Sequence, residues 1–384
     1  MTESDFRIVT VTTQDQRREF AKFPWSIYRD DPNWVPPIFM DHLALLSPGK
    51  HPFHEHAEVE LFLAKRGDDV VGTISAQINH LHNETFKDKV GFFGFFEVIE
   101  EYVVAEALLE KAAEWLRERG MEAIRGPENF SQNEEVGLLI DGFDSPPRVL
   151  MTYNPRYYQD FIERAGFQKA QDLYAWDLQT SIFNDDVQGL PRKFLRVAEE
   201  ARKRDNLVVR NVDMKHYDEE VERIKQVYNE AWEQNWGFVP LTDNEMEHLA
   251  QEMKMVLDPD IVFLAEVDGK PVGVSISLPE INQAMIKARP QPNTWSLPLT
   301  LVKFLWYRRK INAMRAWAVG VIPGYRRMGI EALFTVDTVQ AAFRKGFKRY
   351  EMGWTLESND LVNRIAERLG GEIYKTYRIY EKPT

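Results

Sequence analysis

The sequence of 384 residues has a formal net charge of −12, 44% hydrophobic residues and no cysteine. Its length suits two domains, and without cysteine it has no disulfide framework, thiolate metal site or cysteine nucleophile. The acidic balance argues against nucleic-acid binding, and no apolar run reaches the roughly 18 residues that a membrane-spanning helix needs. We therefore expect a cytoplasmic protein with no transmembrane segment and no nucleic-acid partner.

The first half of the chain predicts an alternation of strands and helices. Two apolar runs flank a turn at 67–69, which is typical of a hairpin. A glycine directly after a helical pattern favours a left-handed cap, so Gly120 marks a helix end. The predicted elements are strands at 60–65 and 70–78, a helix at 105–119, a strand at 122–125, a helix at 158–165 and a strand at 172–178.

The second half repeats this order. An Asp-Gly turn at 268–269 again joins two apolar runs, which is a strong hairpin signal. The predicted elements are strands at 261–267 and 271–277, a helix at 332–345, a strand at 348–352, a helix at 361–369 and a strand at 372–380. We infer an internal duplication, because the same elements return in the same order.

The boundary between the halves follows Leu178. We expect an N-terminal domain at 1–180, a connecting segment at 181–206 that forms a helix, and a C-terminal domain at 207–384. Each half ends in an aromatic-rich strand that should close its own sheet. Because a strand–helix–strand step requires a parallel pair and a hairpin an antiparallel one, the sequence predicts an α/β fold with mixed (α+β) sheets.

The stretch 320–334 joins a strand end, a basic turn and a helix start. A Pro-Gly pair ends the apolar run, Arg326 and Arg327 follow, and Gly329 precedes an amphipathic helix. Free backbone N–H groups and the positive end of a helix dipole favour an anion such as phosphate. The string resembles the acyl-CoA loop of the GNAT N-acyltransferases, whose pattern is Arg/Gln-x-x-Gly-x-Gly/Ala.

The resemblance implies two tandem GNAT-like domains, like those of bacterial tandem GNAT proteins, and acetyl-CoA or another acyl-CoA as co-substrate. The loop would hold the pyrophosphate, the strand before it would pair with the pantetheine amides, and an asparagine follows the fifth strand. The cofactor-binding residues implied in this sequence are Val319, Val321, Arg326, Arg327, Met328, Gly329, Ile330 and Asn359.

The sequence departs from the family pattern at three places. Glu331 stands at the last motif position, where its carboxylate competes with a phosphate for the helix dipole. Ala366 and Gly371 stand where the family has a tyrosine and a phenylalanine, so the usual donor of a proton to the thiolate is absent. No basic glycine loop follows the strand at 91–98, which predicts a degenerate N-terminal domain without acyl-CoA.

Three side chains are candidates for proton transfer. Glu351, on the fifth strand of the second half, is the candidate base, and Tyr374 or Tyr377, on the last strand, would supply a hydroxyl acid. A solvent-facing glutamate and packed tyrosines are the alternatives. The histidines match no zinc spacing, so no metal is expected.

The second half contains an insertion at 287–315. Its segment 295–310 is apolar and aromatic and ends in a basic cluster, which indicates an amphipathic helix. Packing on the protein itself, a lid over a hydrophobic pocket, and contact with anionic lipid remain open. Trp232, Trp236 and Phe238 form an aromatic loop that either packs in the core or lines the acceptor site.

The sequence therefore predicts an acyl-CoA-dependent N-acyltransferase, with acetyl as the expected group, that acts on a primary amine of a small molecule or peptide. A catalytically degenerate ligand-binding protein and an aminoacyl or peptidyl transferase with a non-CoA donor are the alternatives. The identity of the amine and the oligomeric state are not specified by the sequence.

Overall fold

The structure, a computed structural model, describes residues 5–384 except 185 and 234, and the chain divides into two compact units. Unit 1 comprises Met1–Leu173, Asn282–Arg309 and Lys375–Thr384, and unit 2 comprises Tyr174–Ile281 and Lys310–Tyr374. Residue 185 of the predicted connecting segment and residue 234 of the predicted aromatic loop lie outside the described residues. The units are thus not the two halves of the sequence.

Unit 1 contains a mixed sheet. Neighbouring strands from β1 to β4 are antiparallel, and β4 and β5 form the parallel pair that the strand–helix–strand pattern predicts. The strands are β1 (Arg7–Thr10), β2 (Ala57–Arg66), β3 (Asp69–Asn79), β4 (Val90–Val98), β5 (Ala123–Gly126) and β8 (Leu138–Asp141), with a separate small pair of β6 (Glu128–Asn129) and β7 (Glu135–Val136).

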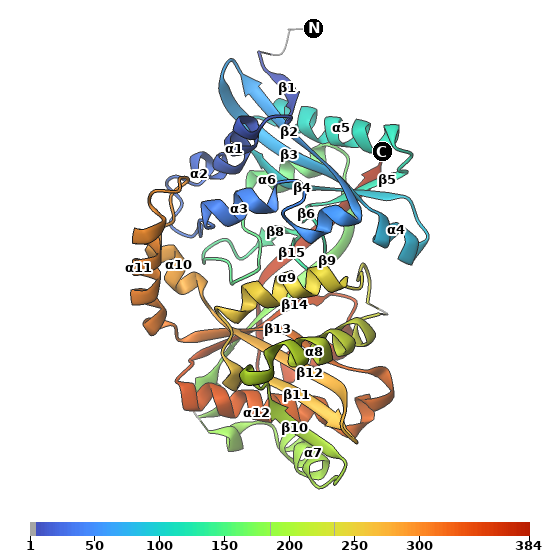
Figure 1. Cartoon of the computed structure of the whole chain (residues 1–384), viewed down its shortest axis with the longest axis vertical. Coiled ribbons are helices and arrows are strands. Elements are labelled where there is room, and N and C mark those ends of the chain that lie inside the picture. Colours follow the sequence, from blue (N-terminus) through green and yellow to red (C-terminus); the bar gives the residue numbers. More distant parts are fainter. Residues whose placement is uncertain (1–4, 185, 234) are drawn as a thin grey trace. The chain divides into compact units, whose positions relative to one another are not determined.

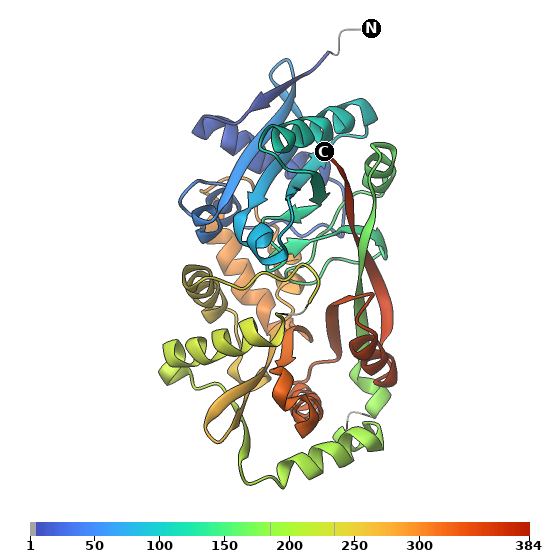
Figure 2. The same ribbon diagram turned by 90° about the vertical axis from the view of Figure 1, so that its right-hand side faces the viewer.

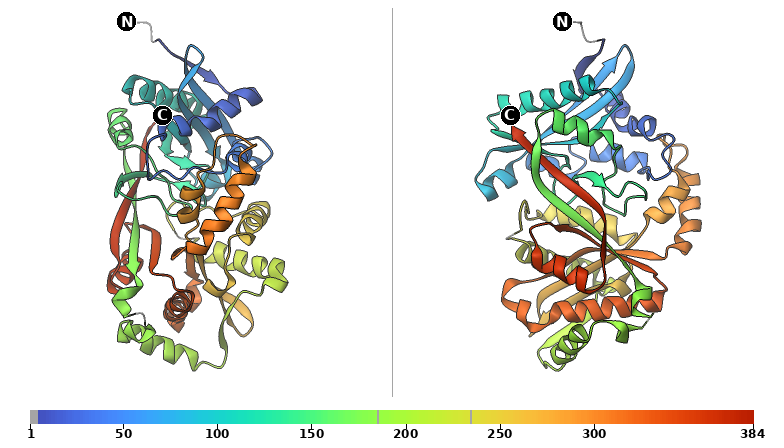
Figure 3. Two further views of the ribbon diagram at one scale, coloured as in Figure 1. Left: turned by 90° about the vertical axis from the view of Figure 1, so that its left-hand side faces the viewer. Right: turned by 180° about the vertical axis from the view of Figure 1, so that it is seen from behind.

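The helices of unit 1 cover this sheet. α5 packs on β3, and Leu108, Leu109 and Leu116 on its inner face have no exposed surface (Figure 1). Helices α10 and α11 lie side by side (Figure 3). The helices are α1 (Gln14–Lys22), α2 (Pro24–Ile27), α3 (Phe39–Leu45), α4 (His80–Phe86), α5 (Tyr102–Glu118), α6 (Tyr157–Arg164), α10 (Asn282–Ala288) and α11 (Leu297–Tyr307).

In unit 1 a chain segment fills the edge of β4. The parallel pairing of β4 with β5 ends at Phe92 and Arg125. Beyond this point β6 lies against β4: Asn129 Oδ1 accepts the N–H of Phe95 at 2.8 Å, and Gln77 donates to the carbonyl oxygen of Glu128 at 2.7 Å. The segment around β6 therefore occupies hydrogen-bonding groups of the neighbouring strands of unit 1.

Unit 2 repeats the arrangement. β10 to β13 are antiparallel in sequence order, and β13 and β14 are parallel. Its elements are β10 (Leu207–Asn211), β11 (Val262–Val267), β12 (Lys270–Pro279), β13 (Ala313–Val321), β14 (Arg349–Leu356), α7 (Arg192–Arg202), α8 (Tyr217–Ala231), α9 (Asp243–Lys254), α12 (Ile330–Lys345) and α13 (Asp360–Arg368). The mixed α/β architecture predicted from the sequence is confirmed.

The predicted connecting helix is α7, and it packs on α12 (Figure 2). Ala198 and Ala201 on its inner face are buried in the same core as Leu333 and Phe334. Small residues on α7 let the two helices approach closely, so α7 forms part of the core of unit 2 and is no loose linker.

The closing strands do not stay with their own halves. β9 (Gln168–Gln179) contributes Tyr174 onward to unit 2, and β15 (Glu372–Pro383) contributes Lys375 onward to unit 1. The end of β15 pairs antiparallel with β5 and with β8. The expectation that each half closes its own sheet is therefore wrong.

Ion pairs hold the exchanged strands. In unit 1, Arg378 Nε lies 2.7 Å from Asp172 Oδ1, and Arg125 Nε donates to Glu381 Oε2 at 2.8 Å. In unit 2, Arg349 binds Asp177 through two nitrogens, at 3.0 and 2.6 Å. Such forked guanidinium–carboxylate contacts select a strand partner more sharply than apolar packing does.

Candidate active site

Strand β13 of unit 2 presents an open edge. Its parallel pairing with β14 covers only Ala313–Ala316, while its antiparallel pairing with β12 continues to Val321 after a register shift. Because Ile322 donates its N–H to Val272 on the β12 side, the alternation of an antiparallel pair turns the N–H and C=O of Val319 away from β12. The residue Val319 is 42% exposed, so β13 is accessible at this position in unit 2.

The basic turn follows this edge directly. Pro323–Met328 form a short 3₁₀-helix, Gly329 has φ 82° and ψ 15°, and α12 starts at Ile330. A Cβ at Gly329 would lie 3.0 Å from Val197 Cγ1 on α7, so both the left-handed backbone and the close approach of α7 require glycine. No side chain caps α12, which leaves its first N–H groups without a capping partner at this end.

The two arginines of the turn differ in their contacts. Arg326 donates from Nε to the carbonyl oxygen of Val321 at 3.1 Å and from Nη2 to that of Ala231 at 2.9 Å. It therefore ties the turn to β13 and to the end of α8. Arg327 is exposed and makes no hydrogen bond or ion pair among the described residues, so its guanidinium is available to an anion.

Glu331 lies in the first turn of α12. Burial raises the pKa of its carboxyl, and the nearby Arg326 acts in the opposite direction. Its backbone oxygen accepts from Thr335 Oγ1 at 2.8 Å, whereas its side chain has no hydrogen bond within the described part of the chain. The carboxyl thus sits beside the turn as a half-buried group that charges less readily than a free glutamate.

Aromatic rings line β13 next to the open edge. Tyr228 stacks on Trp317 with centroids 5.8 Å apart, and it also contacts Trp232 and Phe238. A Cβ at Gly320 would lie 2.5 Å from the Trp232 ring, so the absence of a side chain at this position lets the indole approach the strand closely. This aromatic cluster of Tyr228, Trp232, Phe238 and Trp317 gives unit 2 an apolar wall beside the strand edge.

Glu351 does not face the open edge. It is opposite Arg315 in the β13–β14 pair, with Arg315 Nε 3.0 Å from Glu351 Oε2, and both residues are buried. Arg315 also donates to the carbonyl oxygen of Gly353 at 3.0 Å. A carboxylate without solvent access that is held by a guanidinium is poorly placed to take a proton from a substrate, so we do not retain Glu351 as the base.

The other predicted residues fall in several places. Tyr377 is fully buried in unit 1, while Tyr374 is partly exposed and belongs to unit 2. Asn359 Oδ1 accepts the N–H of Val362 at 3.4 Å and so caps α13. Ala366, which stands at the family's tyrosine, is fully buried, and no hydroxyl takes its place on this face of α13.

The sequence does not single out the carboxyl of Glu97 in unit 1, although the structure gives it unusual surroundings. Glu97 accepts hydrogen bonds from Tyr158 at 2.7 Å and from Tyr28 at 2.9 Å, and Tyr28 stacks on Trp34. Burial raises the pKa of Glu97 to about 8, while the two tyrosine hydroxyls favour its anion. The three polar residues come from distant positions, so no local pattern signals the cluster.

The described residues contain neither a metal-binding cluster nor a membrane-spanning helix. Among them, no group of three or more histidine, aspartate or glutamate side chains is arranged to hold a metal ion. Within the same residues, no helix combines the length and apolar character needed to cross a bilayer.

Known proteins resemble this chain over its whole length. No protein-family model matches it. A bacterial ceramide synthase of Caulobacter vibrioides (strain NA1000 / CB15N) is 36% identical over 99% of this chain and 98% of that protein. The protein YghO of Escherichia coli (strain K12) is 34% identical over 97% of this chain and 94% of that protein.

A solved structure shows the same fold. A tandem GNAT protein from the clavulanic acid biosynthesis pathway covers 98% of both chains with a TM-score of 0.57 at 11% identity. At this identity the likeness concerns the fold alone. The chain therefore has the GNAT fold in tandem, as the resemblance of its loop implied.

Proposed function

Because the chain belongs to the same family as the bacterial ceramide synthase of Caulobacter vibrioides and YghO of Escherichia coli, we propose that it is an acyl-CoA-dependent N-acyltransferase. The observation that carries the proposal is that an open strand edge, a basic turn and an uncapped helix start follow one another along the chain in unit 2. These are the parts that an extended, anionic donor requires in this order.

In this proposal unit 2 binds the donor. The pantetheine amides pair with the backbone of Val319 and Val321, as an added strand would. The pyrophosphate lies against the N–H groups of Met328 to Ile330, with Arg327 as its free cation. Arg326 contributes its charge while it holds the turn to Val321.

The acceptor is proposed to be the primary amine of a long-chain amino alcohol. Its nitrogen attacks the thioester carbonyl, a C–N bond forms, and the C–S bond breaks, so that the products are an amide and the CoA thiol. The name of the Caulobacter relative supports this acceptor, because a ceramide is the N-acyl derivative of such a base. It also favours a fatty acyl group over the acetyl group expected from the sequence.

In this proposal no carboxylate base is needed to remove the proton from the amine. An ammonium that enters an apolar site loses hydration, which lowers its pKa and releases the neutral nucleophile. The aromatic cluster of Tyr228, Trp232, Phe238 and Trp317 supplies such surroundings. Tyr374 stays the candidate acid for the thiolate.

The donor and the cysteine-free sequence both fit a reducing cytoplasm, which stays the proposed location.

The test measures thiol release and donor binding together. The purified protein is incubated with palmitoyl-CoA and sphinganine, free CoA is followed with a thiol reagent, and the amide is identified by mass spectrometry. Arg327→Ala should raise the Kd for CoA by roughly 5- to 50-fold, since charge-assisted contacts to phosphate are of that order.

Arg344→Ala is the matched control, because this exposed arginine lies near the far end of α12, roughly 20 Å along the helix axis from the basic turn. Its Kd should equal that of the wild type. Absence of CoA binding at every acyl length, or equal Kd values for the two variants, would overturn the proposal.

A ligand-binding protein without chemistry is the second candidate. The buried Ala366 in place of a tyrosine and the carboxyl of Glu331 beside the turn both favour it. Under this reading palmitoyl-CoA binds, but no thiol is released with any amine. The same experiment therefore separates the two functions.

A further inference from the structure

Helix α11 of the inserted segment presents two different faces. Its inner residues recur every three to four positions, as expected for one side of a helix, and include Ser296 and Thr300, which are buried. Phe304 and Tyr307 continue this inner side and are partly buried. These contacts hold α11 on unit 1.

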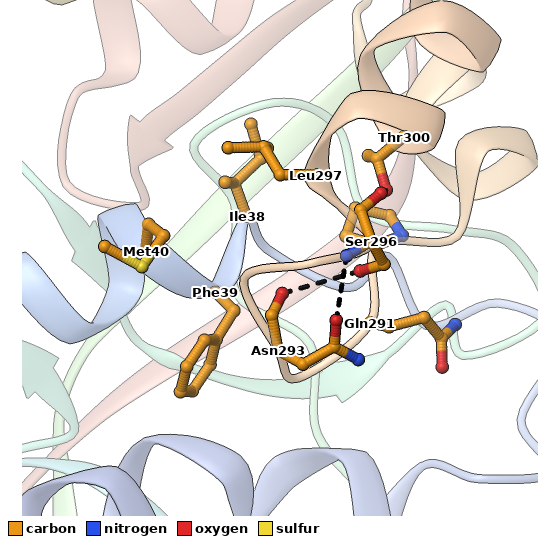
Figure 4. Close-up of a pocket in the computed structure, with 9 residues that line it drawn as sticks. Ile38, Phe39, Met40, Gln291, Asn293, Ser296, Leu297 and Thr300 are labelled. Atoms are coloured by element: carbon orange, nitrogen blue, oxygen red, sulfur yellow. Dashed lines mark hydrogen bonds between the residues drawn. The ribbon is translucent and has the colours of Figure 1, made fainter.

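The contact at the start of α11 is nearly closed. Ile38, Phe39 and Met40 approach Leu297 and Thr300 around a small pocket (Figure 4). This pocket has room for about one water molecule, so it is no binding site for an acyl chain. The inner side of α11 is therefore occupied by the protein itself, and what remains to be explained is its outer side.

The outer side is apolar and uncovered. Within α11, Leu299 is 59% exposed, Val302 65% and Trp306 63%, and their spacing of three and four residues places them in one stripe. Trp295, which is 81% exposed, lies two residues before the start of the helix. Leu301 and Leu305 are also exposed and widen the stripe. A contiguous stripe of this kind marks a contact surface, because large apolar side chains seldom cluster in water without a partner.

Cations accompany the stripe. Lys303 lies within the outer side, and Arg308 and Arg309 follow its end. All three are exposed, and none forms an ion pair among the described residues. On a chain with a net charge of −12, this local excess of positive charge calls for an anionic partner.

The combination fits a lipid surface best. Tryptophan is favoured at the boundary between headgroups and acyl chains, and here one indole lies near each end of the helix. The 11 residues of α11 span roughly 16 Å, which is half of a bilayer core, so the helix suits the interface plane and not a crossing. Lysine and arginine beside an apolar stripe attract anionic headgroups.

We propose that α11 is an interfacial helix that docks the protein on an anionic bilayer through the stripe of Leu299, Val302 and Trp306, together with Trp295 just before the helix. The inserted segment is then neither a lid nor simple packing. This inference goes beyond the proposed function and does not depend on it, although a bilayer is also where a long-chain amine would be found.

The experiment measures binding of the full-length protein to vesicles. Large unilamellar vesicles of phosphatidylcholine alone and of phosphatidylcholine with 30% phosphatidylglycerol are titrated, and bound protein is separated by sedimentation. The wild type should bind the anionic vesicles at least tenfold more strongly, and added salt should weaken this binding. Leu299→Glu/Val302→Glu should reduce the partition coefficient at least tenfold.

Val103→Glu is the matched control, because Val103 is a 58% exposed apolar residue at the start of α5 in the same unit. It should bind like the wild type. Arg308→Gln/Arg309→Gln should lose most of the preference for anionic vesicles, roughly tenfold or more, because each cation near the surface adds to the attraction. Circular dichroism and thermal melting confirm that each variant is folded.

Two results would overturn the proposal. One is equal partitioning of the wild type and the folded Leu299→Glu/Val302→Glu variant. The other is a dimer in lipid-free solution, seen by sedimentation velocity, that the same variant abolishes, because the stripe would then be the contact between two copies of the chain.

Discussion

At the scale of single residues, adjacent side chains of the same type serve different purposes. Arg326 is a structural tie to two carbonyl oxygens, whereas Arg327 is free. The sequence indicates a basic turn but does not distinguish the two arginines, because the distinction depends on where the end of α8 lies. The charge beside the turn also depends on Glu331, because the folded chain partly buries its carboxyl and thereby raises its pKa.

Glu331→Gln is expected to strengthen CoA binding near pH 7.5 by roughly two- to tenfold, because it removes a negative charge beside the pyrophosphate. Burial raises the pKa of this carboxyl, so it is more often neutral at low pH and the two proteins should converge there. Calorimetric titration of CoA from pH 5 to 8 measures the effect, with the exposed Glu372→Gln as control. Parallel curves at all pH values would show that the carboxyl points away from the site.

Glu97→Gln tests the tyrosine-bound carboxyl of unit 1. Its pKa is about 8 in the folded protein, compared with an ordinary value of 4.5. As the pH rises, the unfolded chain therefore loses this proton at a lower pH than the folded protein does. The free energy of unfolding of the wild type should therefore fall, relative to the variant, as the pH rises from about 4.5 to about 8. Urea unfolding at pH 5, 6.5 and 8 measures this difference. The exposed Glu100→Gln should show no such trend, and a constant difference for Glu97→Gln would contradict the raised pKa.

At the scale of elements, β13 and β14 illustrate how one strand serves two tasks. Near its start β13 pairs with β14 and buries the Arg315–Glu351 ion pair. Near its end it has left β14 and presents Val319. The change occurs within a few residues because the pairing with β12 shifts register between Ile276 and Ser277. The ion pair therefore fixes the register of the two strands where they are still joined.

Glu351→Ala is expected to lower the free energy of unfolding by about 3–5 kcal/mol, because it leaves the buried Arg315 without its partner. The double variant Arg315→Met/Glu351→Leu should recover most of this loss, since apolar residues of similar size avoid the unpaired charge. Urea unfolding measures both. A Glu351→Ala protein of unchanged stability that loses thiol release would instead restore Glu351 as the base.

At the scale of the whole molecule, the duplicated halves are linked by their last strands. The end of β15 completes the sheet of unit 1, and the end of β9 belongs to unit 2. Each unit thus needs a segment from the other half of the sequence. An internal duplication that exchanges strands in this way makes folding of one unit depend on the complete chain.

Removal of 375–384 tests this dependence. The truncated protein should lose hydrogen-exchange protection in β5 and β8, which pair with the removed segment, while β10 to β12 of unit 2 keep theirs. Mass spectrometry of the exchanged peptides measures both regions in one sample. Loss of protection in β10 to β12 with β5 intact would show that the segment belongs to its own half.

The sequence by itself determined the elements of each half, their duplication and the position of the basic turn, because these depend on local periodicity and on glycine or proline at fixed places. It also indicated the helix of the inserted segment. Only the tertiary structure decided which strand closes which unit, which arginine is free, that Glu351 is buried against Arg315, and which side of α11 is uncovered. Each of these depends on partners far away in the chain, and local sequence carries no information about distant contacts.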